Sequence, residues 1–347
     1  MDEKPHEMAP TQRSVVRTSA TDEARAQQAG RGRDANRPSE IPARGWHDVA
    51  WRVWEEFNED RIMLVAAGAT FYLLLALFPA LGAFVSLYGF VADPKTIADH
   101  IAFLGSIVPA DGLEIINSQL RALTSQNPGS LSFGFMTGLA IALWSANSGI
   151  RALFEGMNIA YGEAEKRSFI RVNLLSLTFT MGAILIGIGL IVSVGIVPAA
   201  LAFLYLDQWT EILILVLRWP LLMLMIGAGM TILYRYGPSR ERAKWRWINW
   251  GAAISTLVWL VASWGFSFYL QHFANYNATY GTLGAVIGFM MWTWISVIIL
   301  LIGAEVNAEL EHQTARDSTT GAPLPLGDRG AVMADTVGKA AEEHRPA

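Results

Sequence analysis

Long apolar runs separated by short polar segments dominate the central part of the chain. The clearest run follows the polar turn at Tyr276 and carries no charged residue from Thr282 to Gly303. A run of about 20 uncharged, mostly apolar residues is long enough to cross the roughly 30 Å hydrocarbon core of a bilayer as a helix. In lipid the backbone must satisfy its own hydrogen bonds, and a helix does so within one segment. Applied to the whole chain, this pattern predicts six transmembrane helices, at about 62–91, 131–158, 172–206, 209–234, 247–269 and 282–304.

Weaker helical patterns lie on both sides of the first of these spans. Trp46, Val53 and Phe57 recur at helical spacing over residues 46–60, which predicts an interfacial helix that lies in the membrane plane or packs on the bundle. Two further apolar stripes at helical spacing fall within residues 93–127, a segment too polar to span. They predict two short amphipathic helices in the first outer loop.

The two ends of the chain have a different composition. Residues 1–43 and 313–347 are polar and mixed in charge, with few large apolar side chains. Such segments cannot bury enough apolar surface to offset the entropy lost on ordering. The sequence therefore predicts disordered tails at 1–43 and 313–347 around a six-helix transmembrane domain at 44–312.

Lys and Arg alternate between abundant and scarce along the predicted loops. The segment 235–246 between the fourth and fifth spans carries five of them, whereas 207–211 and 271–281 carry none. Because loops rich in Lys and Arg stay in the cytoplasm, this alternation predicts that both termini are cytoplasmic. The predicted fold class is thus an all-α, polytopic protein of a bacterial plasma (inner) membrane, with its N- and C-termini inside.

Composition agrees with this fold and argues against several kinds of chemistry. Charged residues make up 16% of the chain, against about 25% in a soluble domain. The net charge of −4 argues against a nucleic-acid partner, and the absence of cysteine excludes disulfides and thiolate metal sites. The six histidines are scattered, and no phosphate-binding glycine loop is present. We therefore expect no enzymatic activity, no cofactor and no metal.

Polar residues near one end of the second and sixth spans are the candidate functional site. Asn147, Arg151 and Glu155 follow one another at a spacing of four and share one side of the second span. Glu305 and Asn307 reach the same depth from the sixth span. An intramembrane Arg costs at least a few kcal/mol unless it is paired or hydrated, so we predict that Arg151 pairs with Glu305 or Glu155. Such a group would line a cytoplasm-facing cavity for a charged head group; alternatively, the ion pair only fixes helix register.

A second intramembrane cation, Arg218, lies in the fourth span beside Trp219, near the predicted outer boundary. A long cationic side chain can lay its stem along apolar surface and keep its charged end in water. Two interpretations are open: Arg218 merely reaches the surface, or it forms an outward contact with an anion.

Three motifs carry a resemblance to a known family. They are LWSANSGIRALFEGMNIAYG at 143–162, LYRYGPSR at 233–240 and YNATYGTLGAVIGFMMWTWISVIILLIGAEVNAEL at 276–310. Together with the segment from Thr70 to Pro79, they resemble the YihY / virulence-factor BrkB family of bacterial inner-membrane proteins. The resemblance implies a six-span protein linked to serum resistance and to envelope lipid export. Many members carry an old label of ribonuclease, which the scattered histidines do not support.

Two functional hypotheses follow. The first is a transporter or flippase-like protein for an amphipathic or lipid-like, anionic envelope substrate. The alternative is a non-transporting membrane scaffold or envelope-integrity factor, and ribonuclease activity is the least favoured. The expected partners are membrane lipids, with a lipid-like substrate under the first hypothesis, and oligomerisation is left open.

Overall fold

The computed structural model describes residues 19–91, 128–191, 193, 208–272 and 283–344, and within them the regular structure is helical. The predicted all-α class is confirmed for these residues, with one isolated β-bridge between Ala243 and Thr319. The long helices are α2 (Ala43–Glu59), α3 (Ile62–Val91), α6 (Pro128–Ala160), α7 (Phe169–Ile191), α9 (Gln208–Tyr236), α10 (Trp245–His272) and α12 (Gly284–His312). The short ones are α1 (Ala20–Ala26), η1 (Pro38–Glu40), α13 (Val332–Asp335) and η4 (Ala341–His344).

Five described helices, α3, α7, α9, α10 and α12, are long and apolar enough to cross a membrane. Many of their large apolar side chains are exposed, among them Leu185, Leu224 and Trp264, as expected where lipid covers the protein. The helix α6, with 33 residues, lies along α3 but is not among these five, so the count of six crossings stays a prediction. The two amphipathic helices predicted at 93–127, and the end of the span predicted at 172–206, lie outside the described residues.

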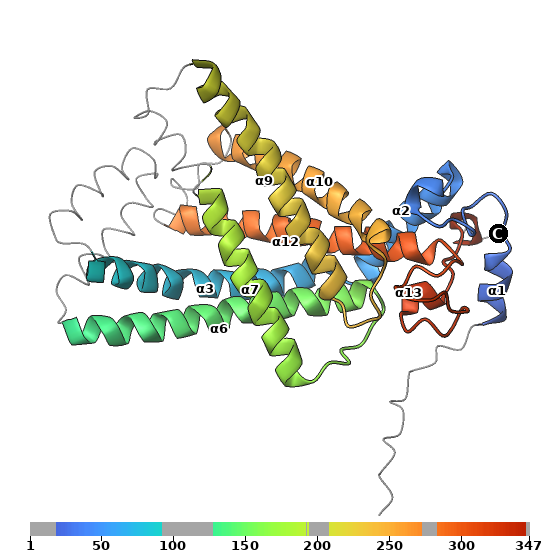
Figure 1. The fold of residues 1–347 in the computed structure, drawn as a ribbon, viewed down its shortest axis with the longest axis horizontal. Helices are drawn as coiled ribbons and strands as arrows, with labels where there is room; N and C mark the ends of the chain where they lie inside the picture. The colour runs from blue at the N-terminus through green and yellow to red at the C-terminus, as the bar shows by residue number, and fades with distance from the viewer. Residues whose placement is uncertain (1–18, 92–127, 192, 194–207, 273–282, 345–347) are drawn as a thin grey trace, which may run out of the picture.

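The long helices form one bundle, in which α3 and α6 lie side by side and α12 lies against α3 (Figure 1). The helix α10 packs on α12, α9 packs on α10, and α7 contacts both α6 and α9. The approach of α10 to α12 depends on two glycines, because a Cβ atom on Gly251 would stand 2.3 Å from the carbonyl oxygen of Gly303. Small residues of this kind let membrane helices pack backbone to backbone.

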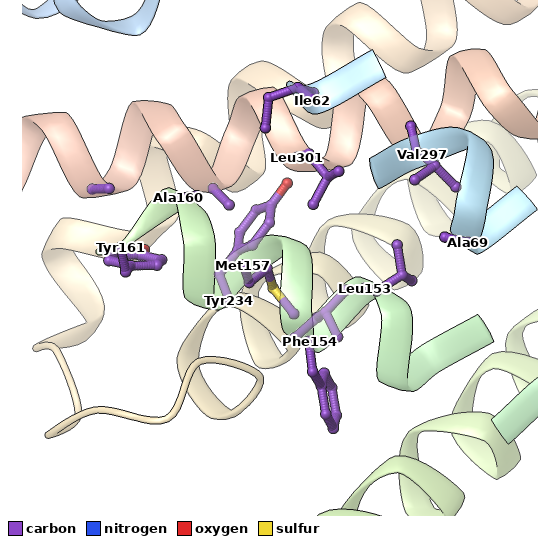
Figure 2. Close-up of a cluster of buried hydrophobic side chains, with 14 of the residues drawn as sticks. Ile62, Ala69, Leu153, Phe154, Met157, Ala160, Tyr161, Tyr234, Val297 and Leu301 are labelled. Carbon is purple, nitrogen blue, oxygen red and sulfur yellow. The ribbon is translucent and has the colours of Figure 1, made fainter. Parts of the chain in front are cut away.

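The apolar core lies where α3, α6, α9 and α12 meet (Figure 2). Leu301 of α12 is completely buried, and the Tyr234 hydroxyl of α9 donates to the carbonyl oxygen of Leu300 at 2.8 Å. Phe154 of α6 meets the ring of Phe179 of α7 edge-on, with 5.5 Å between ring centroids. These contacts fix the depth at which the helix ends present their polar residues.

The flanking segments differ from the expectation of disorder, because residues 19–43 and 313–344 are folded and pack against each other. We call these two segments the cap, and the end of the bundle that they cover the cap end (Figure 1). The buried Arg33 donates to the carbonyl oxygens of Gln313 at 3.1 Å and Gly338 at 2.6 Å. Burial, followed by the nearby Arg52 cation, lowers the pKa of Arg33 to about 10. Hydrogen bonds and ion pairs hold the cap together. The prediction of disorder rests on its low apolar content, which does not report on such contacts.

The helix α2 joins the cap to the bundle. It corresponds to the interfacial helix predicted at 46–60, and it packs on α12 through one side. Two of its charged residues are buried there: Asp48 accepts from Arg31 at 2.8 Å, and Arg52 forms an ion pair with Glu309. Its last residue is followed by Asp60 and Arg61, and Arg61 takes the left-handed conformation with φ of 51°. The turn into α3 is therefore sharp.

Candidate functional site

The residues of the predicted polar site fall into two groups. In the first, Asn147 and Arg151 of α6 face α7, where Nδ2 of Asn147 and Nη1 of Arg151 each lie 3.4 Å from Oδ1 of Asn173. The Ser176 hydroxyl donates to Oδ1 of Asn147 at 2.6 Å, and the Arg151 guanidinium lies 5.6 Å from the ring centroid of Phe169. Arg151 is thus bound by an amide oxygen and an aromatic ring.

The second group lies on α12. Glu305 is completely buried, with 0% of its surface exposed, and it faces Asp60 at the junction of α2 and α3. Asn307 accepts a hydrogen bond from the backbone N–H of Gly251 in α10, at 2.8 Å. These side chains point to two different neighbours of α12.

The predicted pairing of Arg151 with Glu305 or Glu155 is therefore wrong. Arg151 and Glu155 are exposed, and neither forms an ion pair with any residue that the structure describes. The spacing of residues along two helices gives their depth in the membrane, but it does not give the rotation of each helix about its axis. Among the described residues, the five candidates therefore contact different neighbours and do not form one polar group.

Arg218 of α9 lies between a carbonyl and a ring. Its Nη1 is 3.5 Å from the carbonyl oxygen of Ser193, and its guanidinium carbon is 5.3 Å from the ring centroid of Trp219. Its Nε atom is buried without a hydrogen-bond partner among the described residues. Both interpretations of this residue, surface contact and anion contact, stay predictions.

A basic cavity of about 890 Å³ lies at the cap end, between the start of α7, the end of α9 and the loop that joins α9 to α10. Six basic side chains line it, against one acidic side chain, Glu241. The six are Lys166, Arg167, Arg171, Arg235, Arg240 and Arg242. Cavities of 300–1,000 Å³ are typical of small-molecule sites. The size and charge of this one suit an anionic group.

Three of these cations are neutralised by carboxylates. Arg240, with a side chain only 4% exposed, binds both carboxylate oxygens of the buried Glu311, at 2.9 and 2.7 Å. Lys166 pairs with Glu163 at 2.7 Å. Burial disfavours the charged form of Glu165, but hydrogen bonds from Arg167 outweigh it and lower the pKa of Glu165 to about 2. The charges of these three cations are balanced within the protein, so the net positive charge of the cavity comes from the other three.

Arg171, Arg235 and Arg242 form no ion pair among the described residues, so they keep the cavity positive. Arg171 is exposed in the first turn of α7, and the exposed Arg242 lies 4.9 Å from the ring centroid of Tyr236. Arg235 donates to the carbonyl oxygen of Ala243. One acidic group, Glu241, faces these three charges, and so an anion would find a net attraction.

Two buried N–H groups of the lining have no acceptor among the described residues. They are Nη1 of Arg240 and Nε of Arg235. A buried donor without an acceptor costs about 1–3 kcal/mol, and more when the group is charged. Both guanidinium groups lie against aromatic rings, 4.5 Å from the ring centroid of Tyr161 for Arg240 and 4.2 Å from that of Trp245 for Arg235, so protein encloses these two donors.

The wall of the cavity is fixed by the end of α6. The side chain of Asn158 accepts from the backbone N–H of Ser239 at 2.7 Å, and the Ser239 hydroxyl accepts from the backbone N–H of Lys166 at 2.9 Å. Arg167 donates to the carbonyl oxygens of Tyr236 and Gly237, at 3.2 and 2.8 Å. These bonds hold the α6–α7 and α9–α10 loops together, which pre-organises the basic side chains.

The sequence contained the signal for this cavity. The Lys and Arg of 166–171 and 235–246 are visible along the chain, but no pattern in the sequence indicates that the two loops meet. The anchor Asn158 lies two helical turns after Arg151, on the same side of α6, and it is not among the candidate site residues predicted from the sequence.

The sequence of the chain has relatives among known proteins. The family model described as "Virulence factor BrkB" matches residues 53–324 of the chain. The chain belongs to this family. The matched residues include α6, both cavity loops and α12.

Two relatives illustrate the range of the BrkB family. The ribonuclease-like protein YfkH of Bacillus subtilis is 33% identical over 258 residues, which cover 72% of this chain and 90% of that protein. A UPF0761 membrane protein of Paraburkholderia xenovorans is 27% identical over 261 residues, which cover 73% of this chain and 57% of that protein. The chain therefore spans little more than half of the second relative. No solved structure matches the chain.

Proposed function

We propose that the protein binds the headgroup of an anionic amphiphile in the basic cavity and moves that molecule between the two faces of the plasma membrane. The observation that carries the proposal is the cavity itself, with three cations, Arg171, Arg235 and Arg242, that no described carboxylate pairs. Basic pockets between membrane helices on the cytoplasmic side suit anionic lipid headgroups.

The proposal includes a topology. The loops at the cap end are the ones rich in Lys and Arg, which favours the cytoplasm for this end and for both termini. We count α6 as a membrane span too, antiparallel to α3, which brings the number of spans to six. The cavity then lies at the level of the inner-leaflet headgroups, where α7 begins and α9 ends.

The lining favours phosphate over other anionic groups. Five of the six basic residues are arginines, and the planar guanidinium binds phosphate or carboxylate through two parallel hydrogen bonds. Exposed apolar side chains continue along α7 and α9 from the cavity, for example Leu174 and Ile232. An acyl chain would lie along this surface while its headgroup stays between the two loops.

Binding is tested first, with the full-length protein in detergent and short-chain phosphatidylglycerol as the probe. Arg171→Gln combined with Arg242→Gln removes two lining charges whose side chains form no hydrogen bond or ion pair with any described residue. At about 1 kcal/mol for each cation, the affinity should fall about 30-fold. The matched control is Arg44→Gln with Arg246→Gln, which removes two exposed charges outside the cavity and should bind nearly as tightly as the unmodified protein.

Movement is tested second, in liposomes that carry fluorescently labelled phosphatidylglycerol. The unmodified protein should expose inner-leaflet label to a membrane-impermeant quencher faster than empty liposomes do, and the cavity double variant should lose this gain. Binding without movement would favour the scaffold alternative. Equal affinity for phosphatidylglycerol and phosphatidylcholine would overturn the assignment of the cavity.

A further inference from the structure

Glu305 is a buried carboxyl that the basic cavity does not use. It lies in α12, its surface is 0% exposed, and neither of its carboxylate oxygens has a hydrogen-bond donor among the described residues. A carboxylate in this situation is costly, because an unpaired charge in a low-dielectric interior loses its hydration without compensation. The charge of Glu305 must therefore be neutralised in another way, either by a bound proton or by a cation.

The group that faces Glu305 is another carboxyl. Asp60, between α2 and α3, lies within hydrogen-bonding reach of Glu305, and Glu56 and Glu309 add negative charge nearby. Ionised carboxylates only accept hydrogen bonds, so two that face each other cannot form one. A single proton changes this, because the protonated carboxyl donates to the ionised one.

The charged groups on the elements around Glu305 offer no other counter-ion. Arg52 of α2 is bound to Glu309, which also has His312 at 3.5 Å. On the remaining elements, some charged side chains are exposed: Glu59 and Arg61 near the start of α3, Arg151 and Glu155 on α6, and Arg246 on α10. The others are bound elsewhere, since Arg240 pairs with Glu311 and Asp335 of α13 accepts backbone N–H groups. No group of three His, Asp or Glu side chains suited to a metal ion is found in the described part of the chain.

We propose that Glu305 and Asp60 hold one proton between them at neutral pH, which makes the α2–α3 junction a proton-binding site. The proton resides on the fully buried Glu305, which donates a hydrogen bond to the partly exposed, ionised Asp60. It leaves to solvent past Asp60, and both carboxylates are then charged and repel each other. The repulsion acts on the turn at Arg61, which already has a left-handed φ of 51°.

The electrostatics of the neighbouring carboxyls agree with this arrangement. Burial, with Glu59 and Glu309 nearby, raises the pKa of Asp60 despite its hydrogen bond to Glu305. Burial, with the carboxylates of Glu309 and Asp60, raises the pKa of Glu56 to about 7. Like charges within one site cannot all be ionised, so the first proton lost from the group is separated from the last.

The proton is tested by infrared difference spectroscopy on the full-length protein in lipid nanodiscs, titrated from about pH 5 to pH 10, a range that covers documented values for buried carboxyls. Every sample carries Glu56→Gln, because Glu56 itself titrates near neutrality. The parent should show the carbonyl stretch of a buried protonated carboxyl at neutral pH. Glu305→Gln should abolish that band at every pH, whereas Glu59→Gln, which removes an exposed carboxyl at the end of α2, should leave the band in place at neutral pH.

A second variant keeps the test decisive if Glu305→Gln does not fold. Asp60→Asn supplies an amide donor to Glu305, which stabilises the ionised form, so the midpoint of the band should move to lower pH by at least about one unit. The inference is overturned if the parent has no such band at neutral pH, if the band survives Glu305→Gln, or if Asp60→Asn leaves its midpoint in place. A sodium-dependent rise in melting temperature that needs Glu305 would also overturn it, in favour of a bound cation. The site does not depend on lipid movement, so a failed transport assay would leave it intact.

Discussion

Breaking the buried ion pair between Arg52 of α2 and Glu309 of α12 should unfold the cap end. The two side chains are 4% and 1% exposed. Arg52 also donates to the backbone oxygen of Glu309 at 3.2 Å, to Oε1 of Gln313 at 2.8 Å and to the backbone oxygen of Lys339 at 2.7 Å. One guanidinium group thus joins α2, α12 and the C-terminal part of the cap.

The magnitude follows from what each substitution leaves behind. Arg52→Met strands Glu309, whose other ionisable neighbour is His312 at 3.5 Å, and removing one member of a buried pair costs about 3–5 kcal/mol. Glu309→Leu leaves Arg52 with three neutral acceptors, so its cost should be smaller, about 2–3 kcal/mol. The double variant leaves no stranded charge and should be more stable than Arg52→Met alone, which gives a coupling energy of about 2–3 kcal/mol.

The assay is the melting temperature of the purified protein, followed by size-exclusion chromatography after heating. At about 2–4 °C for each kcal/mol, Arg52→Met should melt about 10 °C lower, and the double variant should recover part of that loss. Arg44→Met is the control, since it removes an exposed cation from the same helix. If both single variants melted within a degree or two of the unmodified protein and their effects added, the pair would be screened by solvent and the packing of α2 on α12 described here would be refuted.

Three further predictions concern packing, pH and the cavity. Gly251→Ala should sharply lower the melting temperature, because its new Cβ would stand 2.3 Å from a carbonyl oxygen of α12, whereas Gly265→Ala on the same helix meets nothing within 4 Å and should be neutral or stabilising by up to about 1 kcal/mol. Burial and nearby carboxylates raise the pKa of Glu56 to about 7, so the folded state holds this proton more tightly than the unfolded state; stability from it is full below about pH 4.5 and is lost as pH rises through about 7, and Glu56→Gln should flatten the fall in melting temperature over that range. Asn158→Ala frees the backbone N–H of Ser239 and should weaken phosphatidylglycerol binding several-fold in the same titration, with unchanged binding as the contrary result.

Apolar runs along the chain predicted where the long helices lie, because lipid and length together constrain a membrane helix strongly. The span predicted at 62–91 has the bounds of α3, and the other described helix ends differ by a few residues, except that α12 runs on to His312. The end predicted at 206 lies outside the described residues. That extension carries Glu305, Glu309 and Glu311 inside the helix, where the sequence suggested its end. The burial of Glu309 and Glu311 depends on cations brought by α2 and by the α9–α10 loop, which no local pattern along α12 could reveal.

The candidate site shows the same limit. Depth along two spans suggested that Arg151 and Glu305 meet, but helix rotation turns the first toward α7 and the second toward Asp60. The basic cavity could be predicted only in its charges, since it is formed by two loops far apart in sequence. The cap was missed because its segments are ordered by backbone hydrogen bonds and ion pairs with each other.

The cap also bears on how the protein is made. Residues 19–43 leave the ribosome before the helices of the bundle, yet their partners at 313–344 are translated after all of those helices. The N-terminal segment must therefore wait, unassembled, through the insertion of the whole bundle. Closure of the cap end is then the final event of biogenesis, and a truncated chain that stops after α12 would reach the membrane with its first residues still unfolded.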